Sequence, residues 1–326
     1  MQSDWQTELA ESFRSPTELL AALGLSPDLV SPAIEAVSGF PFRVTRTYAS
    51  RMKKGDPRDP LLLQVLPQTV ELARVAGFDS DPVGDLQALT APGLLHKYAG
   101  RALLISTGAC AIHCRYCFRR NFPYETQQLT RSRESAVLTA IAHDPSIHEV
   151  ILSGGDPLVL GDDRLAELIS ALEAIPHVRR LRIHSRLPVV LPSRLHAGLL
   201  EPLSASRLQI VMVIHANHPN EIDVTVQQGL SRMKRHGFTV LNQAVLLRDI
   251  NDDAETLAAL SEALFQAGAL PYYLHLLDRA QGTAHFDVDE EAAVSIMATL
   301  RRRLPGYLVP KLVREVAGQP YKLPIA

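Results

Sequence analysis

Beyond residue 100, short apolar runs alternate with helical patterns along the chain. Six runs rich in Val, Ile and Leu have the length of buried strands: residues 102–107, 149–154, 180–185, 208–216, 238–247 and 270–277. Each is followed by a segment whose apolar residues recur every three or four positions, as on one helix face: residues 135–143, 162–175, 192–203, 224–237, 253–268 and 289–304. A last strand-like run covers residues 306–316. Six strand–helix units predict an α/β fold with a parallel sheet, either open or closed into a barrel.

Polar residues collect at the C-terminal ends of these strands. Cys110 follows the first run, residues 153–156 end and follow the second, and Asp278 follows the sixth. His215 stands near the end of the fourth run, and Gln243 stands inside the fifth. Because β/α barrels build their active sites at the C-terminal ends of the strands, this end is predicted to be the catalytic face.

The first 98 residues have a different, proline-punctuated pattern that predicts short helices. Ser15 is suited to cap a helix, with Pro16 in its first turn and Glu18 at the third helical position. We therefore expect an N-terminal helical extension over residues 1–98 and a catalytic domain over residues 99–326.

Composition and charge narrow the class of protein. The chain has 326 residues, of which 46% are hydrophobic, so it can bury a sizeable core. Its 33 basic and 35 acidic residues give a net charge of −2, which offers no electrostatic reason to expect nucleic acid or membrane as a partner. The N-terminus lacks the basic start and apolar core of a signal peptide, and we expect a cytoplasmic protein.

All three cysteines lie in the stretch GACAIHCRYCFRR, residues 108–120, which we call the cysteine loop. The spacing C-x3-C-x2-C supplies three thiolates, whereas a structural zinc normally takes four protein ligands. His113 as a fourth zinc ligand would stand between two of the cysteines. A [4Fe–4S] cluster fits better, because three cysteines leave one iron open to a substrate or cosubstrate. A zinc site and a buried apolar cysteine cluster remain as alternatives.

Cys110, Cys114 and Cys117, placed after a first strand with Tyr116 before the last, resemble the radical S-adenosylmethionine (SAM) superfamily. The resemblance implies that the methionyl group of SAM binds the open iron and that the reduced cluster generates a 5′-deoxyadenosyl radical. It also implies a SAM contact for a second motif and two further polar side chains: Ser153, Gly154, Gly155, Asp156, His215 and Gln243. Without the resemblance, the second motif could be an ordinary turn and His215 a core residue.

Longer stretches resemble the lysine 2,3-aminomutase family within this superfamily: residues 94–120, 185–192, 215–221, 241–252 and 271–286. The resemblance implies a partial (β/α)6 TIM-like barrel, with a short C-terminal strand and tail that close the active site. It further implies an isomerase that uses both SAM and pyridoxal phosphate to move an amino group from C2 to C3 of an amino acid.

The same resemblance assigns residues to pyridoxal phosphate and to the substrate. Lys322, seven residues after Glu315, matches the Schiff-base lysine, although an unassigned tail lysine is normally solvated. Arg101 and Lys97 match the two phosphate contacts, Lys97 standing where the family has arginine; either could instead be a loop cation. Arg119 matches the arginine that binds the α-carboxylate. Asp278 and Glu315 match the two acids that receive the ε-ammonium of lysine, although we expect aspartate at 315.

The sequence stops at Ala326, four residues after Lys322. This short form resembles the branch that makes (R)-β-lysine for attachment to translation elongation factor P. The implied partners are L-lysine, an electron donor such as flavodoxin or ferredoxin, and the enzyme that transfers the lysyl group. The alternatives are an aminomutase for arginine, ornithine or glutamate, and an iron–sulfur binding or sensor protein without catalysis.

Overall fold

The computed structural model describes residues 4–30 and 40–325 and contains one ten-stranded sheet whose order follows the chain. The strands are β1 Leu89–Ala91, β2 Leu94–Tyr98, β3 Arg101–Thr107, β4 Glu149–Gly154, β5 Arg180–Ser185, β6 Gln209–Ile214, β7 Thr239–Val245, β8 Leu270–His275, β9 Lys311–Arg314 and β10 Leu323–Pro324. Strands β3 to β9 are parallel, while β1, β2 and β10 are added antiparallel at the two edges. The sheet does not close, so the prediction of a partial barrel is confirmed.

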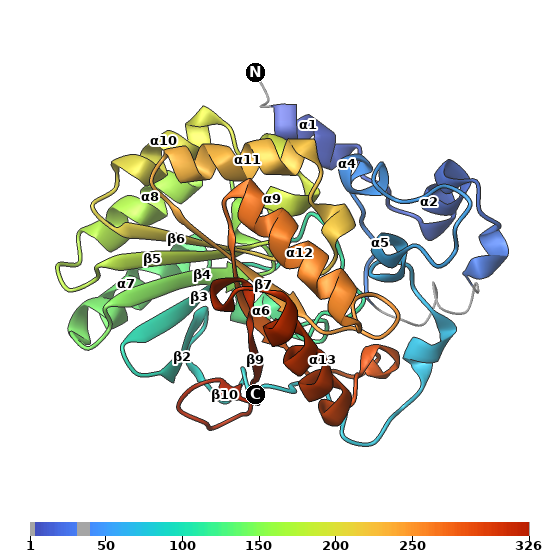
Figure 1. Cartoon of the computed structure of the whole chain (residues 1–326). Coiled ribbons are helices and arrows are strands. Elements are labelled where there is room, and N and C mark those ends of the chain that lie inside the picture. Colours follow the sequence, from blue (N-terminus) through green and yellow to red (C-terminus); the bar gives the residue numbers. More distant parts are fainter. Residues whose placement is uncertain (1–3, 31–39, 326) are drawn as a thin grey trace.

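Helices follow the parallel strands, and the longer ones cover the outside of the sheet (Figure 1). They are α6 Tyr124–Gln127, α7 Arg131–His143, α8 Asp162–Glu173, α9 Leu187–Val190, α10 Ala197–Ala205, α11 Val224–Arg235, α12 Ala254–Ala267 and α13 Glu290–Arg303. The sequence encodes their limits: the Asp253 carboxylate caps the start of α12, and Gly268 ends it with a positive φ of 92°. Within residues 4–30 and 40–325, none of the helices combines the length and apolar character that crossing a membrane requires.

The N-terminal helices lie together at one side of the sheet (Figure 1). They are α1 Asp4–Ala10, α2 Pro16–Leu23, α4 Arg46–Ala49 and α5 Pro60–Leu63. The predicted start of α2 is confirmed, because the Ser15 side chain accepts from the backbone N–H of Thr17. The helical assignment of residues 89–98 is wrong: Gly93, with φ of 92°, turns β1 into β2, and Leu94 and Leu95 are buried in the sheet. The domain boundary at residue 98 stays a prediction.

The two edges of the open sheet approach each other at the C-terminal end of the chain. Lys97 on β2 and Glu315 just after β9 form an ion pair, with 2.9 Å between Nζ and Oε1. The last residues then return antiparallel to β9 as β10, and the chain end lies beside these strands (Figure 1). The opening of the partial barrel is thereby bridged by side chains rather than by a closing strand.

Candidate active site

Two cavities with a common wall are lined by the parallel strands. The first lies at their C-terminal ends, and the second extends to Arg101 and Lys311, the first residues of β3 and β9. The cysteine cavity, of about 260 Å³, is lined by the cysteine loop, and the lysine cavity, of about 390 Å³, is lined by Lys322 and Glu315. The shared wall consists of Phe118, Arg119, Ser153, His184, His215, Gln243, His275 and Asp278. Every site residue predicted from the sequence lines one cavity or both. The cysteine cavity alone is lined by Cys110, Cys114, Cys117, Gly154, Gly155 and Asp156, and the lysine cavity alone by Lys97, Arg101, Glu315 and Lys322. Both cavities are lined by Arg119, Ser153, His215, Gln243 and Asp278.

The cysteine loop presents three free thiols to the cysteine cavity. Burial raises the pKa of the Cys117 thiol to about 11, and the neighbouring Cys114 adds to the shift. Burial also raises the pKa of Cys110, to which Asp156 and the other two cysteines contribute. A positive centre would keep these two buried groups ionised, which fits an iron–sulfur cluster. Within residues 4–30 and 40–325, no three His, Cys, Asp or Glu side chains converge on a place for a single metal ion.

Residues of the N-terminal extension form hydrogen bonds and ion pairs with the cysteine loop. Arg43 Nη1 donates to the carbonyl oxygen of Cys110 at 2.9 Å. The buried carboxylate of Glu71 accepts from Arg115 Nε and from Arg120 Nη2, each at 2.9 Å. The sequence analysis assigned no role to these residues, because no local pattern connects position 71 with the loop.

The two glycines of the second motif are required by the approach of one backbone segment to another. A Cβ on Gly155 would lie 2.3 Å from the carbonyl oxygen of Ala109, and one on Gly154 would lie 2.6 Å from that of Thr107. Gly154 also has a positive φ of 121°. We expected glycine here because a ligand approaches the backbone; the structure gives a second reason, since β4 ends directly against the cysteine loop.

The Asp156 side chain joins the ends of β4 and β5. Its carboxylate accepts from Ser185 Oγ at 2.7 Å and from the backbone N–H groups of Leu158, Arg186 and Leu187 at 3.0, 2.8 and 3.1 Å. Four donors leave this carboxylate little capacity for a ligand. The backbone N–H of Asp156 donates to the Ala109 carbonyl at 2.8 Å. The predicted SAM contact is therefore open only to the Asp156 carbonyl, which already accepts from the Val159 N–H at 3.1 Å.

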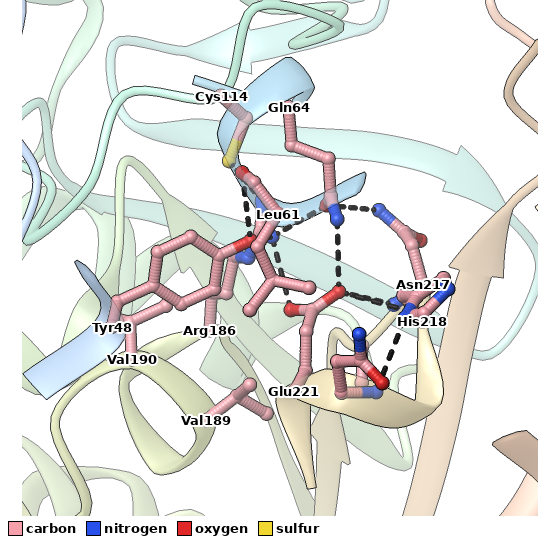
Figure 2. A network of polar contacts seen from close by, with 12 residues as sticks. Tyr48, Leu61, Gln64, Cys114, Arg186, Val189, Val190, Asn217, His218 and Glu221 are labelled. Carbon is pink, nitrogen blue, oxygen red and sulfur yellow. Dashed lines mark hydrogen bonds and ion pairs between the residues drawn. The ribbon is translucent and has the colours of Figure 1, made fainter. Parts of the chain in front are cut away.

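A buried arginine that the sequence analysis did not assign contacts one of the cysteines. Figure 2 shows Arg186 between Cys114 and Glu221. Its Nη1 lies 2.6 Å from Cys114 Sγ, and its Nη2 donates to Gln64 Oε1 at 2.7 Å and to Glu221 Oε2 at 3.1 Å. The Tyr48 hydroxyl accepts from the same nitrogen at 3.2 Å. The guanidinium thus connects the cysteine loop to the N-terminal extension and to the end of β6.

Substitution Glu221→Ala is expected to lower the free energy of unfolding by about 3–5 kcal/mol, because it leaves a buried arginine without its carboxylate partner. Glu221 is fully buried and also accepts from the backbone N–H of Asn217 at 2.9 Å. Urea denaturation of the ligand-free protein measures the change. The control Glu290→Ala removes the exposed pair with Arg314 and should cost less than about 1 kcal/mol. Equal losses in the two variants would contradict the role of the buried pair.

Lys322 lies in the lysine cavity rather than in a solvated tail. Its Nζ forms an ion pair with the Glu315 carboxylate, and only 19% of its side chain is exposed. The antiparallel pairing of β10 with β9 places it there, since Leu323 pairs with Arg314. Lys322 and Glu315, assigned separately to pyridoxal phosphate and to the substrate, are therefore in direct contact.

The two cations predicted for the phosphate of pyridoxal differ in their surroundings. The three donors of Lys97 Nζ are all used, by the Val83 carbonyl at 2.8 Å, by Asp85 at 2.6 Å and by Glu315 at 2.9 Å. Arg101 lines the cavity and has no ion pair or hydrogen bond through its side chain within residues 4–30 and 40–325. Arg101 is thus the better placed of the two to bind a phosphate.

Arg119 is held at the shared wall by two side chains. Its Nε lies 2.6 Å from Asp85 Oδ2, and its Nη1 donates to Ser153 Oγ at 3.0 Å. Burial alone would lower the pKa of Arg119, but the Asp85 carboxylate, together with Tyr124 and Glu315, outweighs burial and raises it. No local pattern in the sequence marks Asp85, because it lies in a loop of the N-terminal extension.

Several buried polar atoms of the shared wall have no partner in the described part of the chain. They include His215 Nε2, Gln243 Oε1 and Asp278 Oδ1, with His184 Nε2 and both ring nitrogens of His275. Buried polar groups normally form hydrogen bonds, so unpartnered atoms around two cavities indicate places for polar ligands. Three of these residues were predicted to contact SAM or the substrate.

Asp278 is expected to make the stability of the ligand-free protein fall as pH rises towards 7. Burial and the nearby Glu315 carboxylate raise its pKa to about 7, Asp85 adds to this, and Lys322 and Lys97 oppose it. Between about pH 4 and pH 7 the folded state keeps a proton on Asp278 that the unfolded state has released. The free energy of unfolding therefore decreases with rising pH by up to about 1.4 kcal/mol per pH unit in this range and levels off above about pH 7. Urea denaturation from about pH 5 to about pH 8 should show this slope in the wild type relative to Asp278→Asn. Parallel pH profiles would contradict the assignment.

Comparisons with known proteins agree with the chemistry of the two cavities. The Radical SAM superfamily matches residues 104–260. L-lysine 2,3-aminomutase from Escherichia coli (strain K12) is 49% identical over 99% of this chain and 94% of its own length. Proteins of the same name from Haemophilus influenzae and Clostridium subterminale are 46% and 32% identical, over 98% and 99% of this chain and 95% and 78% of their own lengths. With identity at this level along nearly its whole length, the chain belongs to the L-lysine 2,3-aminomutase family of the radical SAM superfamily.

Proposed function

We propose that this chain is an L-lysine 2,3-aminomutase, an isomerase that converts L-α-lysine to β-lysine. The names of its relatives support the reaction. The observation that carries the proposal is the wall shared by the two cavities, with three thiols on one side and Lys322 and Glu315 on the other. The proposed migration needs a radical source and a carbonyl cofactor at the same substrate, and adjoining cavities provide for both.

The cysteine cavity suits a [4Fe–4S] cluster and SAM. Cys110, Cys114 and Cys117 would bind the cluster, and their grouped free thiols fit that donor set. The residues that would bind SAM are Ser153, Gly154, Gly155, Asp156 through its backbone, His215 and Gln243. When bound, the cluster and SAM together supply a radical that removes hydrogen from an unactivated carbon.

The lysine cavity suits pyridoxal phosphate. Lys322 would attach its carbonyl carbon, and Arg101 would bind its phosphate, with Lys97 as a second cation if it exchanges one of its present partners. When bound, pyridoxal phosphate supplies a conjugated system that lets nitrogen migrate between neighbouring carbons.

The charges of the lysine cavity suit an amino acid that carries a cation at its far end. Arg119 would bind the α-carboxylate, and a guanidinium fixes the orientation of a carboxylate through paired hydrogen bonds. Asp278 and Glu315 would receive the ε-ammonium group, and two carboxylates repel a substrate with an acidic side chain. Held at both ends, the substrate would present C3 at the shared wall.

We further propose that the product is (R)-β-lysine, used to modify translation elongation factor P. The assignment is supported by identity, which is 49% and 46% to the Escherichia coli and Haemophilus influenzae relatives but 32% to the Clostridium subterminale relative. The partners would be a flavodoxin or ferredoxin and the lysyl-transferring enzyme. Residues 1–98 would then be an extension that holds the cysteine loop, and residues 99–326 the catalytic domain; a cytoplasmic location stays a prediction.

A substrate panel tests the proposal. The reduced holoenzyme is incubated with lysine, arginine, ornithine or glutamate, and β-amino acids are separated by chiral derivatisation and identified by mass. We expect (R)-β-lysine as the main product. Preference for another amino acid would overturn the substrate, an S product would overturn the branch, and a protein that makes neither product nor 5′-deoxyadenosine would be a binding or sensor protein.

A further inference from the structure

Asp85 lies buried between two cations of the lysine cavity. Its Oδ1 is 2.6 Å from Lys97 Nζ, and its Oδ2 is 2.6 Å from Arg119 Nε. Only 2% of Asp85 is exposed. Burial alone would raise the pKa of this carboxyl, but Arg119 and Lys97 together lower it, so the group is ionised. A buried carboxylate with two charged partners at this distance is held firmly in place.

The loop that carries Asp85 packs against the segments that follow Asp278 and Glu315, which we call the acidic pair. The Asp79 N–H donates to the carbonyl of Arg279 at 3.1 Å, and the Asp79 carbonyl accepts from the N–H of Gln281 at 2.7 Å. Both partners lie in the segment that directly follows Asp278. At Gly84, whose φ is 67°, an added Cβ would lie 2.8 Å from Ala317 Cβ, two residues after Glu315. The position of Asp85 is therefore set by the segments that carry the acidic pair.

Two of the three guanidinium nitrogens of Arg119 are used by protein groups. Asp85 takes Nε, Ser153 takes Nη1, and Nη2 has no partner among residues 4–30 and 40–325. Arg119 lines both cavities, so its remaining donors are available to a ligand at the shared wall. A guanidinium is planar, and fixing Nε fixes the direction of its other nitrogens.

Of the two cations, only Arg119 depends on Asp85 for its carboxylate partner. Lys97 also pairs with Glu315, at 2.9 Å, and would keep that partner if Asp85 were replaced. Arg119 has no second carboxylate partner among the ion pairs of the described residues. Loss of Asp85 would therefore act first on the orientation of Arg119.

We propose that Asp85 is a positioning residue that aims Arg119 at the substrate α-carboxylate and so makes the enzyme select substrates that carry one. The inference rests on the proposed function, in which Arg119 binds that carboxylate. Asp85 itself does not contact the reacting atoms. It acts by holding a cation whose geometry decides how well a carboxylate is bound.

Binding measurements with two ligands separate this role from a general structural one. L-lysine and cadaverine, the same chain without the carboxylate, are titrated calorimetrically into anaerobic holoenzyme. For Asp85→Asn we expect the affinity for L-lysine to fall by about 10- to 100-fold, since a charged hydrogen bond is lost, while that for cadaverine stays within about twofold. Asp85→Glu, which keeps the charge, should recover part of the loss for L-lysine.

The control Asp162→Asn removes another aspartate–arginine pair, with Arg194 at 2.6 Å, outside both cavities, and should change neither affinity. Circular dichroism and cluster absorbance verify that each variant is folded and loaded. An equal loss for both ligands, or no loss, would overturn the proposal. If wild-type enzyme binds another amino acid instead of lysine, the proposed substrate fails, and the same comparison with that amino acid and its decarboxylated amine still decides the role of Asp85.

Discussion

Substitution Lys322→Ala is expected to lower turnover at least about 100-fold and to abolish covalent trapping of pyridoxal on the protein. Lys322 lies in the lysine cavity beside Glu315, with its ammonium group held among residues that suit a phosphate and an amino acid. Without this amine, pyridoxal phosphate could bind only through its phosphate and ring. The cofactor would no longer be held in one orientation relative to the shared wall.

Borohydride reduction followed by peptide mass analysis measures the trapping. In wild-type protein the reduced pyridoxyl group should be found on the peptide that contains Lys322. Lys311, the other lysine of the C-terminal segment, also lines the cavity but is exposed. Lys311→Ala should keep the trapped group, and a group found on Lys311 instead would show that the attachment site is misassigned.

The parts of the site that could be predicted from the sequence are those encoded locally. Three cysteines within eight positions define a donor set whatever the rest of the chain does. The alternation of strands and helices places strand ends together, because parallel strands share one C-terminal edge. This is why Asp278 and Gln243, more than 100 residues after the cysteines, line the cysteine cavity as expected. The contact of Lys322 with Glu315 was not predicted, because it depends on the antiparallel return of β10 along β9.

The residues that hold these groups could not be predicted in the same way. Asp85 lies in a loop and Glu71 in a single 3-10 turn over Thr69–Leu72, and their partners are 34 and 44 positions away. Such contacts depend on how the extension folds back over the barrel, which a single sequence does not encode in any short pattern. Arg186 and Glu221 stand in stretches that resemble the family, but the resemblance gives no role to either.

Lys97 shows how a residue can be placed in the right cavity while its contacts differ from those expected. We predicted a phosphate contact, since lysine stands there in place of arginine. In the structure its ammonium group lies between Asp85 and Glu315. A lysine at this position can therefore neutralise the longer carboxylate at 315, and the two departures from the family pattern are in contact with each other.

Substitution Cys114→Ala is expected to remove the iron–sulfur cluster and with it all formation of 5′-deoxyadenosine. A cluster held by three cysteines has no spare protein ligand, and the chain contains no further cysteine to replace a lost one. Iron and sulfide analysis of protein reconstituted under anaerobic conditions measures cluster content, and chromatography measures 5′-deoxyadenosine. Retention of either in the variant would contradict the radical SAM assignment of this loop.

The control His113→Ala separates a cluster from the zinc site that the same loop could form. His113 stands between the first two cysteines and lines the cavity, with its Nδ1 buried and unpartnered in the described residues. A zinc site would need it as a fourth ligand, whereas a cluster with one open iron would not. We therefore expect His113→Ala to keep iron, sulfide and 5′-deoxyadenosine formation, although the contact of its ring with Phe40 is lost. If the histidine variant loses its metal as completely as the cysteine variant, His113 is a ligand, and no iron is left open for SAM.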